Sequence, residues 1–263
     1  MKIATDNNFI TPGSLEISDW RALKINGEQT KVMDFLQGQL TSDIGLLDEN
    51  KLQLSCICDH KGQVVADFVV LKEDKDFFII IHKDFVTIFQ NELEVFAKFG
   101  SVIFEISDYK IIGEIHKKED ARHFFHSNDD FALSICLQKP DFENKNTINL
   151  DIWNAASKIH GIFYLEESDS RKFRPLEINY DKQRVSFEKG CFRGQEIVAR
   201  MKYLGVDRRK FCTFITNNDF LENDLIKILG KIITIDDRKV FNGIIKKDDA
   251  EKVKKISEII SIL

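Results

Sequence analysis

One cysteine in this chain has neighbours that favour a reactive thiol. Cys191 lies in the segment Lys-Gly-Cys-Phe-Arg-Gly-Gln-Glu, where Gly190 and Gly194 bracket it and Lys189 and Arg193 flank it with positive charge. Gly190 permits backbone conformations closed to other residues, and Gly194 is suited to open the helix that the following residues predict. A helix N-terminus and two nearby cations favour the thiolate form. The alternative is a buried structural cysteine in a glycine-rich turn.

This cysteine lies in a stretch of positive charge, which we call the cationic island. Between Arg171 and Lys210 there are twelve Lys or Arg and five Asp or Glu, a net charge of +7. The whole chain carries −5, so the remainder carries −12. A cationic island on an acidic protein indicates a bound anion, such as a carboxylate tail, a phosphate or a nucleic-acid backbone. A solvated surface loop is the plainer alternative.

The composition predicts a cytoplasmic protein with a sizeable core. The 263 residues suffice for one large domain or for two to three small ones, and 22 phenylalanines indicate a Phe-rich interior. No apolar run reaches the roughly 20 residues that a membrane helix needs, so we expect no membrane partner. The first eleven residues lack an apolar segment, so we expect no signal peptide. Five cysteines, an odd number, suit a reducing compartment better than a disulfide framework.

The hydrophobic spacing predicts an α+β protein of ferredoxin-like units followed by a small antiparallel β-barrel. We place the boundaries at 1–115, 116–205 and 206–263. An amphipathic helix begins at Glu28 and is capped by Gly38, and a hairpin turns at Asp59 to Gly62. Further strands are predicted near 15–17, 23–25, 76–82, 102–106, 109–115, 131–137, 185–187, 211–215, 225–229, 232–235 and 240–245, with helices near 85–100 and 147–158.

Two groups of residues could bind a metal, but the sequence favours other roles. Cys56 and Cys58 alternate with neighbours on a predicted strand and no second ligand pair stands at suitable spacing, so we place them on a core face. His116, His123 and His126 lie close together in the sequence. Only the last two could share a helix face, so no metal site is predicted there.

The cysteine segment continues as Lys-Gly-Cys-Phe-Arg-Gly-Gln-Glu-Ile-Val-Ala-Arg and resembles the Lys-Gly-Cys-Tyr/Phe-x-Gly-Gln-Glu signature of the YgfZ family. That family is related in fold to the glycine-cleavage T-protein. Three other segments also resemble it: Gln-Gly-Gln-Leu-Thr-Ser-Asp at 37–43, Cys-Asp-His-Lys-Gly at 58–62 and Pro-Leu-Glu-Ile-Asn at 175–179. The resemblance implies a T-protein-like ring of ferredoxin-like α+β units that encloses a folate, with the small barrel at the C-terminus.

The resemblance also implies a binding site for tetrahydrofolate or a polyglutamylated folate. It matches Trp20 and Trp153 to the tryptophans that YgfZ proteins present to the folate, although most tryptophans are simply core or interface residues. Lys189, Arg193 and Glu196 of the signature are implied as further contacts to the folate. The cationic island would attract its acidic glutamate tail.

The function implied is an accessory factor that supports iron–sulfur cluster assembly or repair and, through it, cluster-dependent tRNA modification. Its partners would be folate and iron–sulfur assembly or client proteins, with tRNA involved only indirectly. Cys191 would act as a redox thiol or a transient cluster ligand. The T-protein uses an Asp-Asp pair for aminomethyl transfer, but the matching positions here are Ala66 and Asp67. A folate-dependent transferase using Asp67 and a tRNA-binding module built on the cationic island remain the two alternatives.

Overall fold

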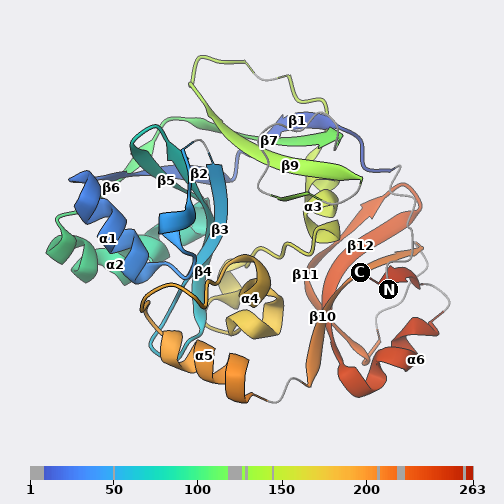
Figure 1. The fold of residues 1–263 in the computed structure, drawn as a ribbon. Helices are drawn as coiled ribbons and strands as arrows, with labels where there is room; N and C mark the ends of the chain where they lie inside the picture. The colour runs from blue at the N-terminus through green and yellow to red at the C-terminus, as the bar shows by residue number, and fades with distance from the viewer. Residues whose placement is uncertain are drawn as a thin grey trace.

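The computed structural model describes residues 9–49, 51–117, 126–127, 130–143, 145–205, 208–217, 223–256 and 259–262. Within these ranges the chain forms three sheets with helices packed on and between them (Figure 1). The helices and strands are β1 (Gly13–Glu16), β2 (Trp20–Asn26), α1 (Gln29–Gln39), β3 (Lys51–Cys58), β4 (Val64–Glu73), β5 (Asp76–His82), α2 (Val86–Gly100), β6 (Ile103–Ser107), β7 (Lys110–Lys117), β8 (His126–Ser127), β9 (Phe131–Gln138), α3 (Leu150–Ile159), α4 (Tyr180–Gln183), α5 (Gln195–Leu204), β10 (Arg209–Asn217), β11 (Ile226–Ile235), β12 (Arg238–Lys246), α6 (Ala250–Lys254) and β13 (Ile259–Ile262).

The first sheet has five strands in the order β3-β4-β5-β2-β6, and α1 and α2 cover one of its faces (Figure 1). The apolar residues whose spacing predicts α1 are the residues that the helix buries, namely Val32, Phe35 and Leu36. Edge-to-face and tilted phenylalanine pairs fill the layer between helices and sheet, with Phe104 packing against both Phe35 and Phe89. The predicted Phe-rich interior lies here.

The second sheet has the order β1-β7-β9-β8 and packs, together with α3, against the other face of the first sheet. Asn149 caps α3, because its side chain accepts a hydrogen bond from the Ile152 backbone N–H at 2.9 Å. The buried face of α3 contacts β7 on one side and β11 and β12 on the other. This helix therefore lies between the second and the third sheet.

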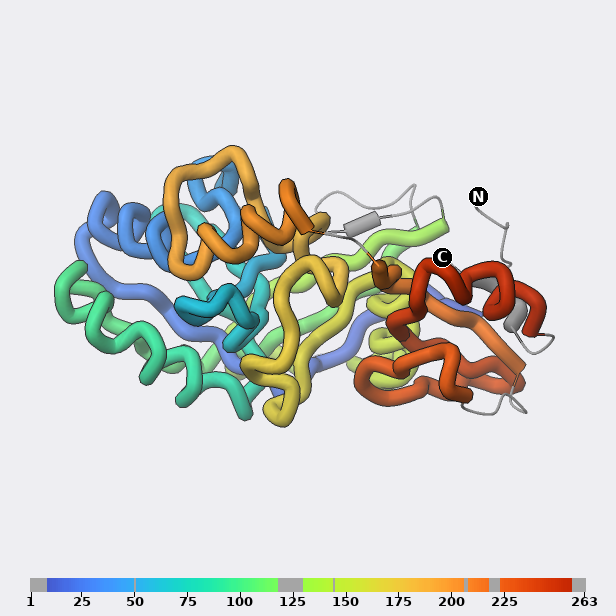
Figure 2. The backbone as a smooth tube through the Cα atoms, turned by 90° about the horizontal axis from the view of Figure 1, so that it is seen from below, coloured from blue at the N-terminus to red at the C-terminus, as the bar shows by residue number. Residues whose placement is uncertain are grey.

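The third sheet has the order β11-β12-β10-β13 and is open within the described residues. Figure 2 shows it at one end of the molecule, with α1 and α2 at the opposite end. The strands predicted at 225–229 and 232–235 are one long strand, β11, which is interrupted by an irregularity between Leu229 and Ile233. Gly230 at that irregularity adopts a left-handed conformation with φ 62°. Closure of this sheet into a barrel stays a prediction.

Three local predictions are wrong. Residues 185–187 form no strand and belong to the loop that leads to α5. Gly38 lies inside α1 rather than after it. Gly190 is not in the left-handed region, so it needs no special backbone conformation. The segment at 121–125 and His123 lie outside the described residues. No helix within the described ranges is both long enough and apolar enough to cross a membrane.

Gly194 is the glycine of the signature that the fold requires. It precedes α5 with φ 79°, and a Cβ there would collide with the backbone carbonyl of Asp59 in the β3–β4 turn. We expect Gly194→Ala to lower the free energy of unfolding by about 2 kcal/mol or more, because left-handed strain and overpacking add. Gly190→Ala is the matched control, since a Cβ there meets nothing within 4 Å. Denaturant unfolding in which both variants were equally stable would contradict this assignment.

Candidate functional site

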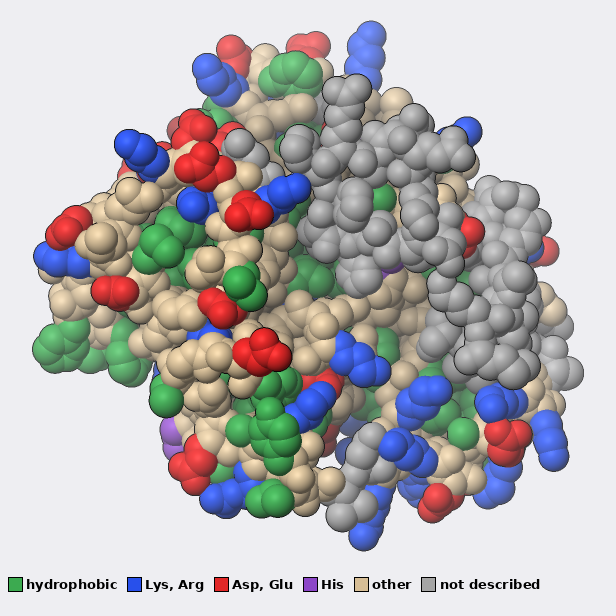
Figure 3. All heavy atoms as spheres, in the orientation of Figure 1, with side chains coloured by type: hydrophobic (Ala, Val, Ile, Leu, Met, Phe, Trp, Pro, Cys, Tyr) green, Lys and Arg blue, Asp and Glu red, His purple; other side chains and the backbone are tan. Residues whose placement is uncertain are grey.

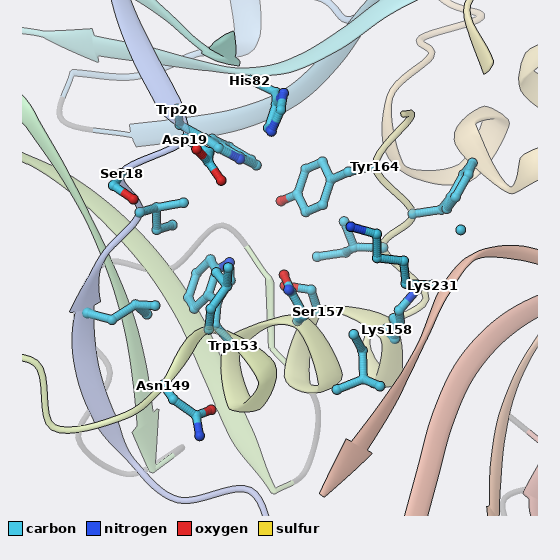
Figure 4. Close-up of a pocket in the computed structure, with 18 of the residues that line it drawn as sticks. Ser18, Asp19, Trp20, His82, Asn149, Trp153, Ser157, Lys158, Tyr164 and Lys231 are labelled. Atoms are coloured by element: carbon cyan, nitrogen blue, oxygen red, sulfur yellow. The ribbon is translucent and has the colours of Figure 1, made fainter. Parts of the chain in front are cut away.

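A cavity of about 380 Å³ lies where elements from all three sheets meet. Its wall comes from the β1–β2 junction, α3, the segment 162–166 and β11 (Figure 4). Asp67 of β4 also lines it. This volume falls in the range of small-molecule sites, roughly 300–1,000 Å³. The cavity is therefore the candidate binding site of the described structure.

The two tryptophans singled out in the sequence both line this cavity. The ring of Trp20 packs edge-to-face against Tyr164, with centroids 4.9 Å apart. Trp153 is only 1% exposed, and its ring lies so close to β7 that a Cβ at Gly113 would be 3.1 Å from it. Trp153 is thus a core residue that also borders the cavity, whereas Trp20 and Tyr164 present aromatic surface to it (Figure 4).

Two hydroxyl groups in the wall are buried without a hydrogen-bond partner. They are Ser157 Oγ on α3 and Tyr164 Oη, and both point into the cavity (Figure 4). An unsatisfied buried hydroxyl costs roughly 1–3 kcal/mol, so such groups are normally paired. Their position indicates that a ligand with polar edges completes them.

The cavity is bordered by two lysines that have no acidic partner within 4 Å among the described residues. Lys158 of α3 is nine-tenths buried, and burial lowers the pKa of its ammonium to about 8. Lys231 of β11 is exposed at the rim. Figure 4 shows both on the side of the cavity away from Ser18 and Asp19.

Behind the aromatic wall, Asp67 is held by a fully buried arginine. Arg184 Nη2 lies 3.2 Å from Asp67 Oδ2, and the Leu165 N–H donates to Asp67 Oδ1 at 3.2 Å. Burial raises the pKa of Asp67, against the attraction of the guanidinium. The same guanidinium donates to the carbonyls of Ser55, Phe68 and Phe163, so it cross-links three separate segments.

None of the signature residues lines the cavity. The Lys189 ammonium is buried and donates instead to the backbone carbonyls of Gln37, Leu40 and Ser42 at 2.6–3.0 Å. These groups lie at the C-terminal end of α1, where carbonyls lack helical partners and a cation is favourable. Burial lowers the pKa of Lys189 to about 8. Lys189 therefore pins the signature loop to α1 and is not available to a ligand in the cavity.

The other charged residues of the signature are also engaged by protein groups. Arg193 forms an ion pair with Glu92 of α2 at 2.5 Å, and Arg171 pairs with the same carboxylate. Glu196 is exposed and pairs with Arg200 one turn along α5. Lys189, Arg193 and Glu196 thus lie outside the cavity and are each engaged by protein groups, and their predicted folate contacts stay a prediction.

Much of the cationic island is neutralised within the fold. Besides the pairs above, Lys202 meets Asp181 at 3.0 Å and Arg209 approaches Glu177 at 3.8 Å. On the face drawn in Figure 3, Lys and Arg side chains gather over the third sheet and α6, and β10 of that sheet begins with Arg209 and Lys210 of the island. Asp59, Asp67 and Glu92, which lie outside the island, pair with its arginines, so the net charge counted along the sequence overstates the free positive charge of this segment.

The cysteines differ in exposure. Cys191 is exposed, as a working thiol requires. Cys56 and Cys58 are buried on β3, which confirms the predicted core face, and the Cys56 thiol together with burial raises the pKa of Cys58 well above its ordinary value. Within the part of the chain that the structure describes, no cluster of three His, Cys, Asp or Glu could hold a metal ion.

The sequence analysis missed Tyr164, Ser157, Lys158 and Lys231. A signal existed for Ser157, which stands four residues after Trp153 and so shares its helix face. The other three have no local pattern that separates them from surface residues. Only the packing of α3 against β11 and the segment 162–166 brings them together.

The fold is that of the glycine-cleavage T-protein. A crystal structure of the glycine cleavage system aminomethyltransferase T from Bartonella henselae matches 89% of this chain and 78% of that chain, with a TM-score of 0.59. The sequence identity is 13%, so this likeness shows the fold and not the activity.

Sequence relatives define the family within that fold. An uncharacterized protein of Haemophilus influenzae is 30% identical over 204 residues, which are 76% of this chain and 72% of that protein. The tRNA-modifying protein YgfZ of Colwellia psychrerythraea is 25% identical over 229 residues, and that of Pectobacterium atrosepticum is 26% identical over 233. These matches cover 75% and 74% of this chain and 70% and 68% of the relatives. No protein-family model matches the chain. The chain belongs to the YgfZ family.

The buried pair behind the cavity can be tested by stability. We expect Arg184→Met to lower the free energy of unfolding by about 3–5 kcal/mol, because it leaves Asp67 and three carbonyls buried without their donor. Arg209→Met is the control, since Arg209 is exposed and its contact with Glu177 is long, so its loss should cost less than about 1 kcal/mol. Urea denaturation that gave both variants the same stability would refute the assigned role of Arg184.

Proposed function

We propose that this protein binds a reduced folate and supports iron–sulfur cluster assembly or repair, and through it cluster-dependent tRNA modification. The observation that carries the proposal is the meeting of Trp20, Trp153 and Tyr164 with two unpaired buried hydroxyls in one cavity. The relatives named tRNA-modifying protein YgfZ support the tRNA-related role. We place the protein in the cytoplasm, in keeping with its odd number of cysteines.

The residues of the cavity fit a folate. Its flat heterocycle needs aromatic surface, which Trp20 and Tyr164 present, and its polar ring edges need hydrogen-bond partners, which Ser157 Oγ and Tyr164 Oη are free to supply. A bound reduced folate would supply a carrier for one-carbon units. The protein's part is to bind the heterocycle, to orient it and to exclude water from it.

The contacts of Asp67 favour this function over a role of that residue in aminomethyl transfer. One oxygen of that carboxylate accepts the Leu165 N–H and the other faces Arg184, so the group is committed to the protein. Its neighbour in the sequence is Ala66, which is buried and carries no acid. Binding without turnover is therefore the role that we assign to the cavity.

The proposed folate site also requires a particular arrangement of the three parts of the chain. We infer three units at 1–115, 116–205 and 206–263 that close as a ring around the folate, the last of them completed as a small antiparallel barrel. The T-protein likeness supports this arrangement. Iron–sulfur assembly or client proteins would meet the ring at the loop of Cys191, which is exposed.

Folate binding can be measured by tryptophan fluorescence, because the chain has only two tryptophans. We expect tetrahydrofolate to quench the wild type saturably and Trp20→Phe to weaken binding about threefold to tenfold, the usual worth of an aromatic contact. Tyr203→Leu, on α5 outside the cavity, is the control and should leave the affinity unchanged. Absence of quenching together with absence of calorimetric binding would exclude the proposed function.

The thiol can be tested in a bacterial strain that lacks its own YgfZ-family protein. We expect Cys191→Ser to fail to restore cluster-dependent tRNA modification, because a hydroxyl neither ionises nor ligates iron as a thiolate does. Cys136→Ser, a change at a half-buried cysteine of β9, should restore it fully. Full restoration by Cys191→Ser would remove the thiol from the mechanism.

A further inference from the structure

We propose that Lys158 and Lys231 form an anion subsite that holds the carboxylates of the ligand's glutamate tail. This inference rests on the proposed function, and it moves the tail from the cationic island to the wall of the cavity. The two amines lie on different elements, Lys158 at the end of α3 and Lys231 on β11. A tail with one glutamate carries two carboxylates, which matches the two amines in number.

The acidic residues of the cavity wall are already paired or engaged, and the lysines are not. Asp19 accepts from Lys83 at 2.6 Å, Asp67 faces Arg184, and Glu16 lies 3.8 Å from Lys110. Glu166, the acid whose charge acts on Lys158, is exposed, and its carboxylate caps the short helical turn at 167–169. Within the described residues, no carboxylate lies within 4 Å of either lysine of the subsite.

Lys158 is placed as a binding group rather than as a surface residue. Its side chain is nine-tenths buried, and its ammonium would be 3.9 Å from a Cβ at Gly230, across the irregularity of β11. Its backbone carbonyl accepts from Thr213 Oγ1 at 2.7 Å and from Asn242 Nδ2 at 3.2 Å, which fixes the end of α3 on the third sheet. A largely desolvated amine with no carboxylate within 4 Å destabilises the fold, and a directly bound carboxylate would lower that cost.

The subsite predicts how affinity depends on the parts of the ligand. Calorimetry measures the affinity of the wild type, Lys158→Met and Lys231→Met for three ligands. These are tetrahydrofolate, 6-methyltetrahydropterin, which has no tail, and p-aminobenzoyl-L-glutamate, which has no pterin. We expect Lys158→Met to weaken tetrahydrofolate about 10- to 100-fold, the worth of a charge-assisted hydrogen bond, and to leave the tail-less pterin within about twofold. Lys231→Met should act in the same direction but less, because Lys231 is exposed.

A control variant separates this subsite from the cationic island. Lys210→Met removes an exposed charge of the island and should leave all three affinities unchanged. The unfolding midpoint of ligand-free Lys158→Met should equal or exceed that of the wild type, since a buried unpaired amine is lost. A lower midpoint would show that Lys158 is structural and would overturn the proposal.

The remaining outcomes also decide it. Equal weakening of tetrahydrofolate and of the tail-less pterin by Lys158→Met, or no weakening of either, overturns the subsite and leaves folate binding intact. If the wild type binds neither tetrahydrofolate nor the pterin, the proposed function fails, and p-aminobenzoyl-L-glutamate decides the subsite alone. If the wild type binds p-aminobenzoyl-L-glutamate and Lys158→Met does not, the subsite for an acidic tail is supported. If the wild type does not bind it, the proposed subsite is overturned.

Discussion

The buried guanidinium of Arg184 is the interaction on which the cavity depends. It is fully enclosed, lies over the ring of Tyr180 at 4.5 Å and bonds to carbonyls of β3, β4 and the segment before Tyr164. A buried cation of this kind is costly unless its hydrogen bonds and its counter-ion are all present. Here Asp67 and three carbonyls engage the two terminal nitrogens, and only Nε of this guanidinium is buried without a hydrogen-bond partner, so the aromatic wall and the first sheet are held together.

The same segment of chain connects the cavity to the exposed cysteine. The backbone carbonyl of Arg184 accepts from Thr41 Oγ1, and the Ser186 N–H donates to the Thr41 carbonyl. A few residues further on, Lys189 closes the C-terminal end of α1 with three hydrogen bonds. The signature loop is thus fixed to the scaffold that forms the back of the cavity, although it does not line it. The lysine of the signature therefore holds the loop in place, whereas Cys191 in the same loop is exposed.

Local patterns in the sequence were sufficient for most of the elements but for only part of the site. The helix at α1 follows from the spacing of Val32, Phe35 and Leu36, and the hairpin at Asp59 to Gly62 follows from its turn residues, because both depend on neighbours in the chain. The role of Lys189 could not be derived in this way, since its partners lie about 150 residues earlier and their free carbonyls exist only once α1 has formed.

The charge of the cationic island could not be read from the sequence for a related reason. A net charge counted along the chain says nothing about which acids fold back onto it, and Glu92 and Asp59 approach it from distant elements. Lys158 is the opposite case, because the sequence analysis missed a cation that has no carboxylate within 4 Å among the described residues. It reads as an ordinary polar residue at the end of a helix, yet the third sheet buries it. Long-range packing decides which cations remain free, and spacing in the sequence does not encode it.

The bonds of Arg184 also set an order of events during synthesis. They join residues 116 and 129 positions apart, so β3 and β4 leave the ribosome long before their arginine does. The β3–β4 hairpin closes across a short turn, whereas the contacts to Arg184 require closure of a very long loop. Until Arg184 has been synthesised, Asp67 lacks this counter-ion and the segment that carries Tyr164 lacks its hydrogen bond to the guanidinium. The nascent chain therefore carries an incompletely packed interior until Arg184 has been synthesised.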